Sequence, residues 1–194
     1  LADLAGEGWW SGDLHLHRPL EDIERLMSAE DLHVASVVTW WNKKNLWTDR
    51  KPPENPLFRF DGNRYYHVLG GEDERGGGAL LFFHLDAPLG ITNATREHPS
   101  AAHYLAQARR HAGAWVDIEK PLWWDTPVWL AQGVDSVGLA VNHMCRDSML
   151  ENEAWGRPRD EQRLPPPRGN GFYTQELYYQ ILNAGLRVPP SAGS

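Results

Sequence analysis

The sequence predicts a single α/β domain of parallel strands with helices between them. Apolar runs of strand length recur along the chain, and helical stretches separate several of them, which is the pattern of repeated βα units. Candidate metal ligands follow several of these strands, where the carboxyl ends of a parallel barrel meet. The length of 194 residues suits one domain over residues 1–194 with a sizeable apolar core.

The predicted strands are apolar runs bounded by charged or by Gly- and Pro-bearing segments. A charged, glycine-rich turn at 72–78, EDERGGG, separates two of them. The last strand is barely completed before the chain ends, so the barrel is expected to be truncated at its C-terminus. In chain order the predicted strands cover residues 9–17, 32–41, 64–71, 79–86, 114–118, 134–141 and the segment from 186 onward.

The predicted helices show apolar spacing on one face or a glycine stop. Leu20, Ile23 and Met27 recur at three- and four-residue intervals after Pro19, which is typical of a helix start. Residues 42–63 are polar and without a clear period, which predicts a long loop that covers a site. The other predicted helices cover residues 99–111, 122–132 and 173–184.

Charge and cysteine content exclude several functions. The chain has 19 Lys and Arg against 26 Asp and Glu, a formal net charge of −7, which disfavours nucleic acid as a partner. Its single cysteine, Cys145, excludes an intramolecular disulfide and an all-cysteine metal cage. We therefore expect a small-molecule substrate as the partner, while the oligomeric state is not fixed by the sequence.

No segment predicts membrane insertion. The longest apolar run, ALLFF at 79–83, is far shorter than a bilayer span, and no basic and apolar leader opens the chain. The first residue is Leu1 rather than methionine, so a secretion signal can precede it. We expect a soluble protein, cytoplasmic or exported.

The stretch GDLHLHRP at 12–19 carries the first candidate ligands. Side chains alternate along a strand, so His15 and His17 face the same way, with Cα atoms roughly 6.6 Å apart. Two imidazoles in this arrangement can converge on one metal, while Asp13 on the same face can orient a ring. The alternative is that both histidines have only packing roles.

Further candidate ligands follow the later strands. In a parallel barrel they would all lie on one rim. Imidazole with carboxylate suits zinc first, or manganese or iron, rather than calcium. Each of these later candidates has a structural alternative. Glu72 would be solvated in a charged turn, and His84 would be a hydrogen-bonded core histidine. Glu119 would pair with Lys120, and His143 would pack on Met144. The predicted metal ligands are His15, His17, Glu72, His84, Glu119 and His143.

At GDLHLHRP, GGEDE and FFHLD the chain resembles the PHP (polymerase and histidinol phosphatase) superfamily of metallohydrolases, in particular its carbaryl-hydrolase-like branch. The resemblance implies a distorted (βα)7 TIM-like barrel with up to three divalent metals, hydrolysing phosphoesters or carbamate and amide-like bonds. It makes His15 and His17 first-strand ligands, Glu72 the bridging carboxylate and His84 the following histidine.

The chain departs from the family pattern at three places. Thr39-Trp40-Trp41-Asn42 stands where many members carry Thr-Asp-His, and Glu119-Lys120-Pro121 stands where they carry His-Pro. The closing motif Gly-Ser-Asp-x-His stops here at Gly193-Ser194. These departures imply a reduced site with one or two metals.

The expected activity is metal-dependent hydrolysis of a phosphoester, ester, amide or carbamate bond. A bound divalent ion lowers the pKa of water and polarises the bond to be cut. Glu119 or Asp117 would take the proton of the water as general base.

Two other functions stay open at this point. An amidohydrolase-type barrel also opens with His-x-His, and its essential lysine would be Lys120. A catalytically lapsed barrel would instead bind a sugar or aromatic ligand through the tryptophans at its mouth, namely Trp40, Trp41, Trp47, Trp123 and Trp124.

Overall fold

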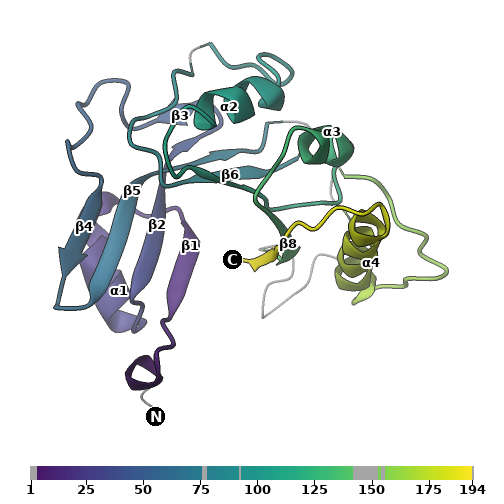
Figure 1. Cartoon of the computed structure of the whole chain (residues 1–194), viewed down its shortest axis with the longest axis horizontal. Coiled ribbons are helices and arrows are strands. Elements are labelled where there is room, and N and C mark those ends of the chain that lie inside the picture. The colour runs from purple at the N-terminus through teal and green to yellow at the C-terminus, as the bar shows by residue number, and fades with distance from the viewer. Residues whose placement is uncertain (1–3, 76–77, 92, 142–152, 154–155, 194) are drawn as a thin grey trace.

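The computed structural model describes residues 4–75, 78–91, 93–141, 153 and 156–193. Its centre is one curled mixed sheet with helices packed around it (Figure 1). The strands are β1 (Gly12–Leu16), β2 (Val34–Trp41), β3 (Lys44–Asn45), β4 (Leu57–Phe60), β5 (Arg64–Asp73), β6 (Leu80–Phe83), β7 (Trp115–Ile118), β8 (Ser136–Ala140) and β9 (Pro190–Ala192). The helices are α1 (Ile23–Ala29), α2 (Ala101–Ala108), α3 (Thr126–Ala131) and α4 (Gly169–Asn183), with short 3-10 helices at Ala5–Glu7 and Leu20–Asp22.

The strand order is β1-β2-β5-β6-β7-β8-β9, with β3 beside β2 and β4 beside β5. The pairs β1/β2, β2/β5, β7/β8 and β8/β9 are parallel, while β6 is antiparallel to both of its neighbours. On this path, within the described chain, β6 is therefore the one strand that runs against the others. Within the same residues β1 and β9 do not pair with each other, so the sheet is open.

The predicted (βα)7 barrel is thus wrong. Only residues 74–79 connect β5 to β6, whereas a parallel crossover needs about a dozen residues or more, so the short turn forces β6 to run back. The hairpin strands β3 and β4 also lie in 42–63, where the sequence predicted only a loop. Four α-helices among the described residues are too few and too short to cover a closed barrel.

Apart from β3 and β4, the strands and helices fall where the sequence predicts them, with ends shifted by a few residues. For example, α4 begins at Gly169 rather than at residue 173, and α3 begins at Thr126 rather than at residue 122. The core strand β5 is buried continuously from Tyr66 to Asp73, as expected for a central strand covered on both faces.

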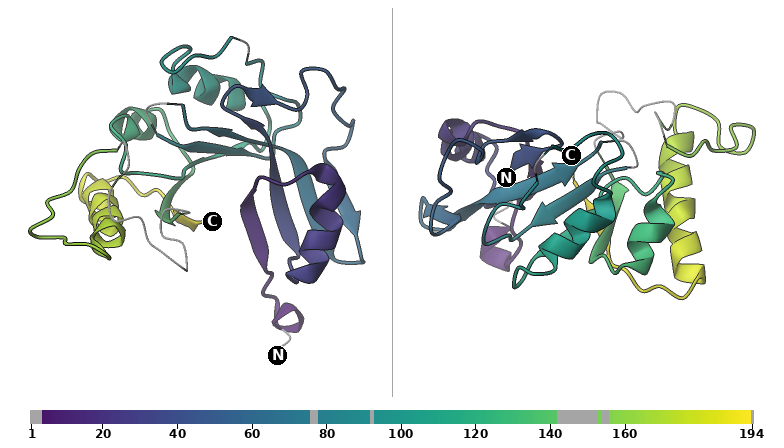
Figure 2. Two further views of the ribbon diagram at one scale, coloured as in Figure 1. Left: turned by 180° about the vertical axis from the view of Figure 1, so that it is seen from behind. Right: turned by 90° about the horizontal axis from the view of Figure 1, so that it is seen from above.

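Hydrophobic packing fixes the helices on the sheet. Ile23 and Met27 of α1 pack against Val37 and Val68 of β2 and β5. A second cluster joins β6, β7 and β8 to α2, with Phe82 among its fully buried members. Figure 2 shows α1 beside the first half of the sheet and α2, α3 and α4 beside the second half. Among the described residues, no helix combines the length and apolarity needed to cross a membrane.

Candidate metal centre

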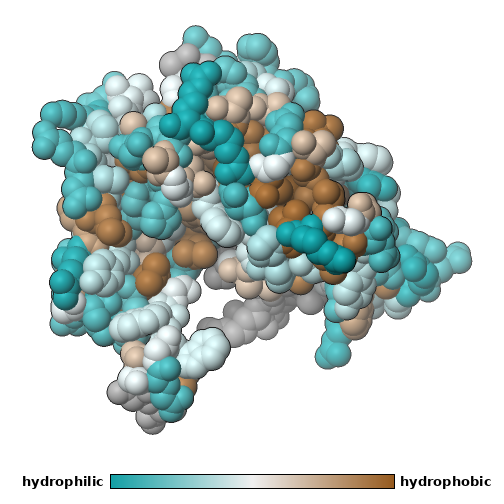
Figure 3. Space-filling model, in the orientation of Figure 1, coloured by the Kyte–Doolittle hydropathy of each residue, from teal (hydrophilic) through white to brown (hydrophobic). Residues whose placement is uncertain are grey.

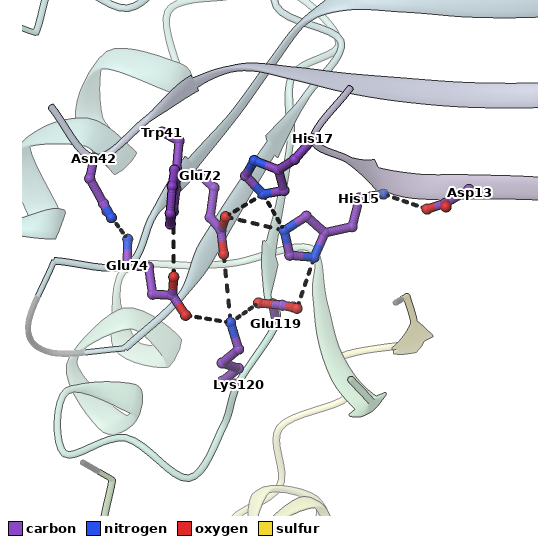
Figure 4. A network of polar contacts seen from close by, with 9 residues as sticks. All are labelled: Asp13, His15, His17, Trp41, Asn42, Glu72, Glu74, Glu119 and Lys120. Carbon is purple, nitrogen blue, oxygen red and sulfur yellow. Dashed lines mark hydrogen bonds and ion pairs between the residues drawn. The ribbon is translucent and has the colours of Figure 1, made fainter. Parts of the chain in front are cut away.

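Three side chains from two strands meet at the carboxyl end of the sheet (Figure 4). His15 lies on β1, His17 directly follows it, and Glu72 lies near the end of β5. Both strands run parallel to β2, which lies between them, so their carboxyl ends point the same way. Of the six predicted ligands, the structure brings these three together in one group.

A bulge in β1 shapes the histidine pair. The register between β1 and β2 shifts between Asp13 and Leu16, and the carboxylate of Asp13 accepts a hydrogen bond of 2.9 Å from the backbone N–H of His15. Asp13 therefore holds the backbone rather than a ring, unlike the sequence prediction. The two imidazole rings converge, with centroids 4.9 Å apart.

The three inward-facing atoms form a nearly equilateral triangle. His15 Nε2 lies 3.0 Å from His17 Nε2 and 3.1 Å from Glu72 Oε2, and His17 Nε2 lies 2.9 Å from Glu72 Oε2. Ligands about 2.1 Å from one ion stand about 3.0 Å apart on an octahedral face and about 3.4 Å apart on a tetrahedron. The triangle therefore has the size of one face of a metal coordination sphere, made from two histidines and one carboxylate.

Electrostatics at the triangle favour a cation. Burial opposes the charge of Glu72, but contacts with His15 and His17 outweigh it and lower the pKa of Glu72 to about 2. Burial likewise opposes protonation of His15, but contacts with Glu119 and Glu72 raise its pKa to about 10. Glu72 is thus held as a carboxylate that attracts positive charge. A metal that binds here must displace the proton of His15.

A second carboxylate contacts the outer nitrogen of His15. Glu119 follows β7 and places Oε1 3.0 Å from His15 Nδ1, the ring nitrogen that faces away from the triangle. A carboxylate in this position orients a ligating imidazole. Glu119, predicted both as a ligand and as a general base, does not belong to the three-residue ligand group.

A buried lysine completes the network. Lys120 Nζ lies 2.7 Å from Glu74 Oε1, 2.8 Å from Glu119 Oε2 and 3.6 Å from Glu72 Oε1. Burial opposes its charge, but the carboxylates outweigh that effect and raise the pKa of Lys120 above its usual value. Glu72 Oε1 and both oxygens of Glu119 are buried without a hydrogen bond of normal geometry, so these carboxylates depend on cations for compensation.

Gly138 allows β8 to pass close to the site. A Cβ atom at this position would lie 2.2 Å from the carbonyl oxygen of Glu119. Any larger side chain would push the two strands apart, so the glycine is needed to keep Glu119 beside His15.

The remaining predicted site residues lie elsewhere. His84 follows β6, whose direction is reversed, and its ring stacks on His67 with centroids 5.4 Å apart. Asp117 is buried on β7 and accepts hydrogen bonds from Ser136 and Ser191. Burial raises the pKa of Asp117 above its ordinary value. His143 lies outside the described residues.

Sequence reasoning missed the role of Glu74 and the contact between Trp41 and His17. Glu74 is two residues after Glu72, so the pattern Glu-Asp-Glu at the end of a strand could have indicated two carboxylates on one face. Trp41 packs edge-on against His17, with ring centroids 5.2 Å apart, and its Nε1 lies 3.4 Å from Glu74 Oε2. Trp41 therefore borders the triangle, and Glu74 is linked to it through Trp41 and Lys120.

Most tryptophans proposed for a binding mouth lie elsewhere. Trp40 and Trp123 are buried, and Trp40 belongs to the hydrophobic cluster around β6. Trp124 is exposed, and Trp47 donates a hydrogen bond to Thr39. Trp41 is the member of that set that contacts a histidine of the triangle.

Comparisons with protein-family models, with curated proteins and with solved structures find no significant match to this chain. The resemblance to the PHP superfamily therefore rests on the sequence motifs alone and stays a prediction.

Proposed function

We propose that this chain is a divalent-metal-dependent hydrolase acting on a small molecule through a phosphoester, ester, amide or carbamate bond. The observation that carries this proposal is the triangle of His15, His17 and Glu72, whose ligand atoms are 2.9 to 3.1 Å apart. The same class of activity is implied by the resemblance of the motifs to PHP metallohydrolases. Zinc is the first choice of metal, because it outranks iron and manganese in affinity for such ligands.

The site is buried on one side and accessible on the other. The side chains of His15 and Glu72 are 3% and 2% exposed, whereas that of His17 is 38% exposed. Three ligands from the chain leave coordination positions for water and substrate. A bound divalent ion would supply an activated water and polarise the scissile bond.

The chain's own carboxylates have different parts in this proposal. Glu119 holds the outer nitrogen of His15 and is itself held by Lys120, so it fixes the imidazole. Neither of the two predicted bases is free to take a proton: Asp117 is engaged by Ser136 and Ser191, and the two oxygens of Glu119 are engaged by His15 and Lys120. We therefore assign to Glu119 the positioning of His15 and assign no general base.

A cavity on the inner face of the sheet supports a small-molecule substrate. It has a volume of about 660 Å³, and its lining comes from both halves of the sheet. Glu119 lines it and contacts His15, whereas His15, His17 and Glu72 themselves are not among the lining residues. Figure 3 shows the molecule hollowed between the part that carries β1 and the part that carries β8. Most of its wall is apolar, including Leu14, Leu81, Phe83 and Trp115. Binding sites for small molecules have this size and character.

The test is hydrolysis of a panel of nitrophenyl phosphate, acetate and carbamate esters and a nitroanilide. The protein is stripped with a chelator and reloaded with zinc, manganese or iron. We expect at least one class to be hydrolysed, the activity to vanish on stripping and to return on reloading. Glu72→Gln should be inactive and Glu176→Gln active, because Glu176 is outside both the triangle and the cavity and forms an ion pair with Arg163. Equal rates for wild type and Glu72→Gln on every substrate would contradict the proposal.

A further inference from the structure

Lys120 lies where a second cation would sit in a metal centre of this design. Its Nζ is within ion-pair distance of three carboxylate oxygens, from Glu74, Glu119 and Glu72. A lysine ammonium has three N–H donors, so its donors match the number of surrounding carboxylates. Its side chain is fully buried, at 0% exposure.

Glu72 shares its two oxygens between the triangle and the lysine. Oε2 faces the two histidines, whereas Oε1 faces Lys120 Nζ (Figure 4). In centres with two metal ions, the ions lie about 3.5 to 4 Å apart. A carboxylate that bridges such a pair turns one oxygen to each ion. Glu72 likewise turns one oxygen to the triangle and the other to Lys120.

We infer that Lys120 replaces a second metal ion, so that the centre binds one divalent ion per chain. Lys120 then acts as a positioning residue: it keeps Glu119 beside His15 and holds the outer oxygen of Glu72. This inference rests on the metal site of the proposed function and is independent of the reaction that the metal serves.

Charge balance supports one ion rather than two. Three carboxylates, those of Glu72, Glu74 and Glu119, surround a single ammonium. This set carries two net negative charges, which one divalent ion neutralises when the histidines bind as neutral ligands. A second divalent ion would leave two excess positive charges at a buried site, where uncompensated charge is costly.

The test counts metal ions per chain. Each of three proteins, the wild-type chain and two Lys120 variants, is dialysed separately against zinc or manganese. Excess metal is then removed, and bound metal is measured by native mass spectrometry and elemental analysis. We expect one ion in the wild type. Lys120→Ala removes the cation and opens space among the carboxylates, so it should bind two. Lys120→Met is the matched control, because it removes the charge but fills the space, and it should bind one.

Each outcome decides a separate point. Two or more ions in the wild type would overturn the role of Lys120 and leave the proposed metal centre intact. No ion in the wild type would overturn both. A folded Lys120→Ala chain that binds only one ion would also overturn the inference. If circular dichroism shows that Lys120→Ala does not fold, the count in the wild type decides alone.

Discussion

Two histidine pairs lie on this sheet and differ in what surrounds them. His15 and His17 converge on Glu72, and the pKa of His15 is raised to about 10 by Glu119 and Glu72 despite its burial. His67 and His84 stack on each other, and burial, with the nearby charge of His84, lowers the pKa of His67 to about 4. Among the described residues, only the first pair belongs to a group that can hold a metal. The carboxylate, rather than the pairing of imidazoles, makes a histidine pair suitable for a cation.

Strand direction explains why only one pair acquires a carboxylate. β1, β5 and β7 run the same way, so their carboxyl ends bring together His15, Glu72 and Glu119. β6 runs the other way, and Glu72 lies opposite Leu81 near the start of that strand. His84, at the end of β6, is carried away from the triangle and toward His67.

The largest expected difference between the two pairs is in metal affinity. Glu72→Gln should weaken zinc or manganese binding by more than about 100-fold, because loss of partners that only orient ligands already costs about 10- to 100-fold. His84→Gln should leave the affinity unchanged. Titration against a competing chelator measures both. Similar losses in the two variants would mean that both ends of the sheet take part in binding.

A smaller loss is expected at the residue behind the first pair. Glu119→Gln keeps the shape of the side chain but removes the charge that faces His15 Nδ1 and Lys120. Metal affinity should fall by about 10- to 100-fold. Glu176→Gln, which loses only an exposed ion pair with Arg163, is the control and should bind metal as the wild type does. An unchanged affinity in Glu119→Gln would show that this carboxylate does not orient His15.

The second pair should affect stability rather than metal binding. Because His67 has a pKa of about 4 in the fold and an ordinary value near 6.5, the unfolded chain binds its proton more tightly. The contribution of neutral His67 to the free energy of unfolding is therefore complete above pH 6.5 and is lost as the pH falls to 4. The total loss is on the order of 3 kcal/mol. Urea unfolding of the metal-free protein at several pH values should show this dependence. His67→Gln should remove the part of the pH dependence that lies between pH 6.5 and 4. An identical pH dependence in the variant would contradict the assignment to His67.

The smallest expected effect concerns the contact within the second pair. His84 has a positive φ of 55°, a conformation that asparagine tolerates well. His84→Asn removes a nearby positive charge, so the pKa of His67 should rise slightly toward its ordinary value, while burial still holds it low. Proton NMR of the His67 ring across pH 3 to 7 measures the change. A fall in that pKa would contradict the repulsion between the two rings.

Local sequence patterns predict the parts of the site that depend on a single strand end. The His-x-His spacing at 15 and 17 and the carboxylate Glu72 after an apolar strand are sufficient for the triangle. Apolar periodicity also gives the positions of the strands and helices, since burial of one face determines it.

Relations between distant strands are harder to predict. The position of His84 depends on whether β6 is parallel or antiparallel, and the length of the turn at 74–79 was the available signal. The role of Lys120 depends on three carboxylates that come from two strand ends. The hairpins of β3 and β4 are short strands at the sides of larger ones, which have little periodicity of their own.

Anomalous diffraction from crystals of the metal-loaded protein tests the central claim most directly. With zinc bound, the account predicts an anomalous peak about 2.0 to 2.2 Å from His15 Nε2, His17 Nε2 and Glu72 Oε2. A peak beside His67 and His84, with none at the triangle, would contradict it.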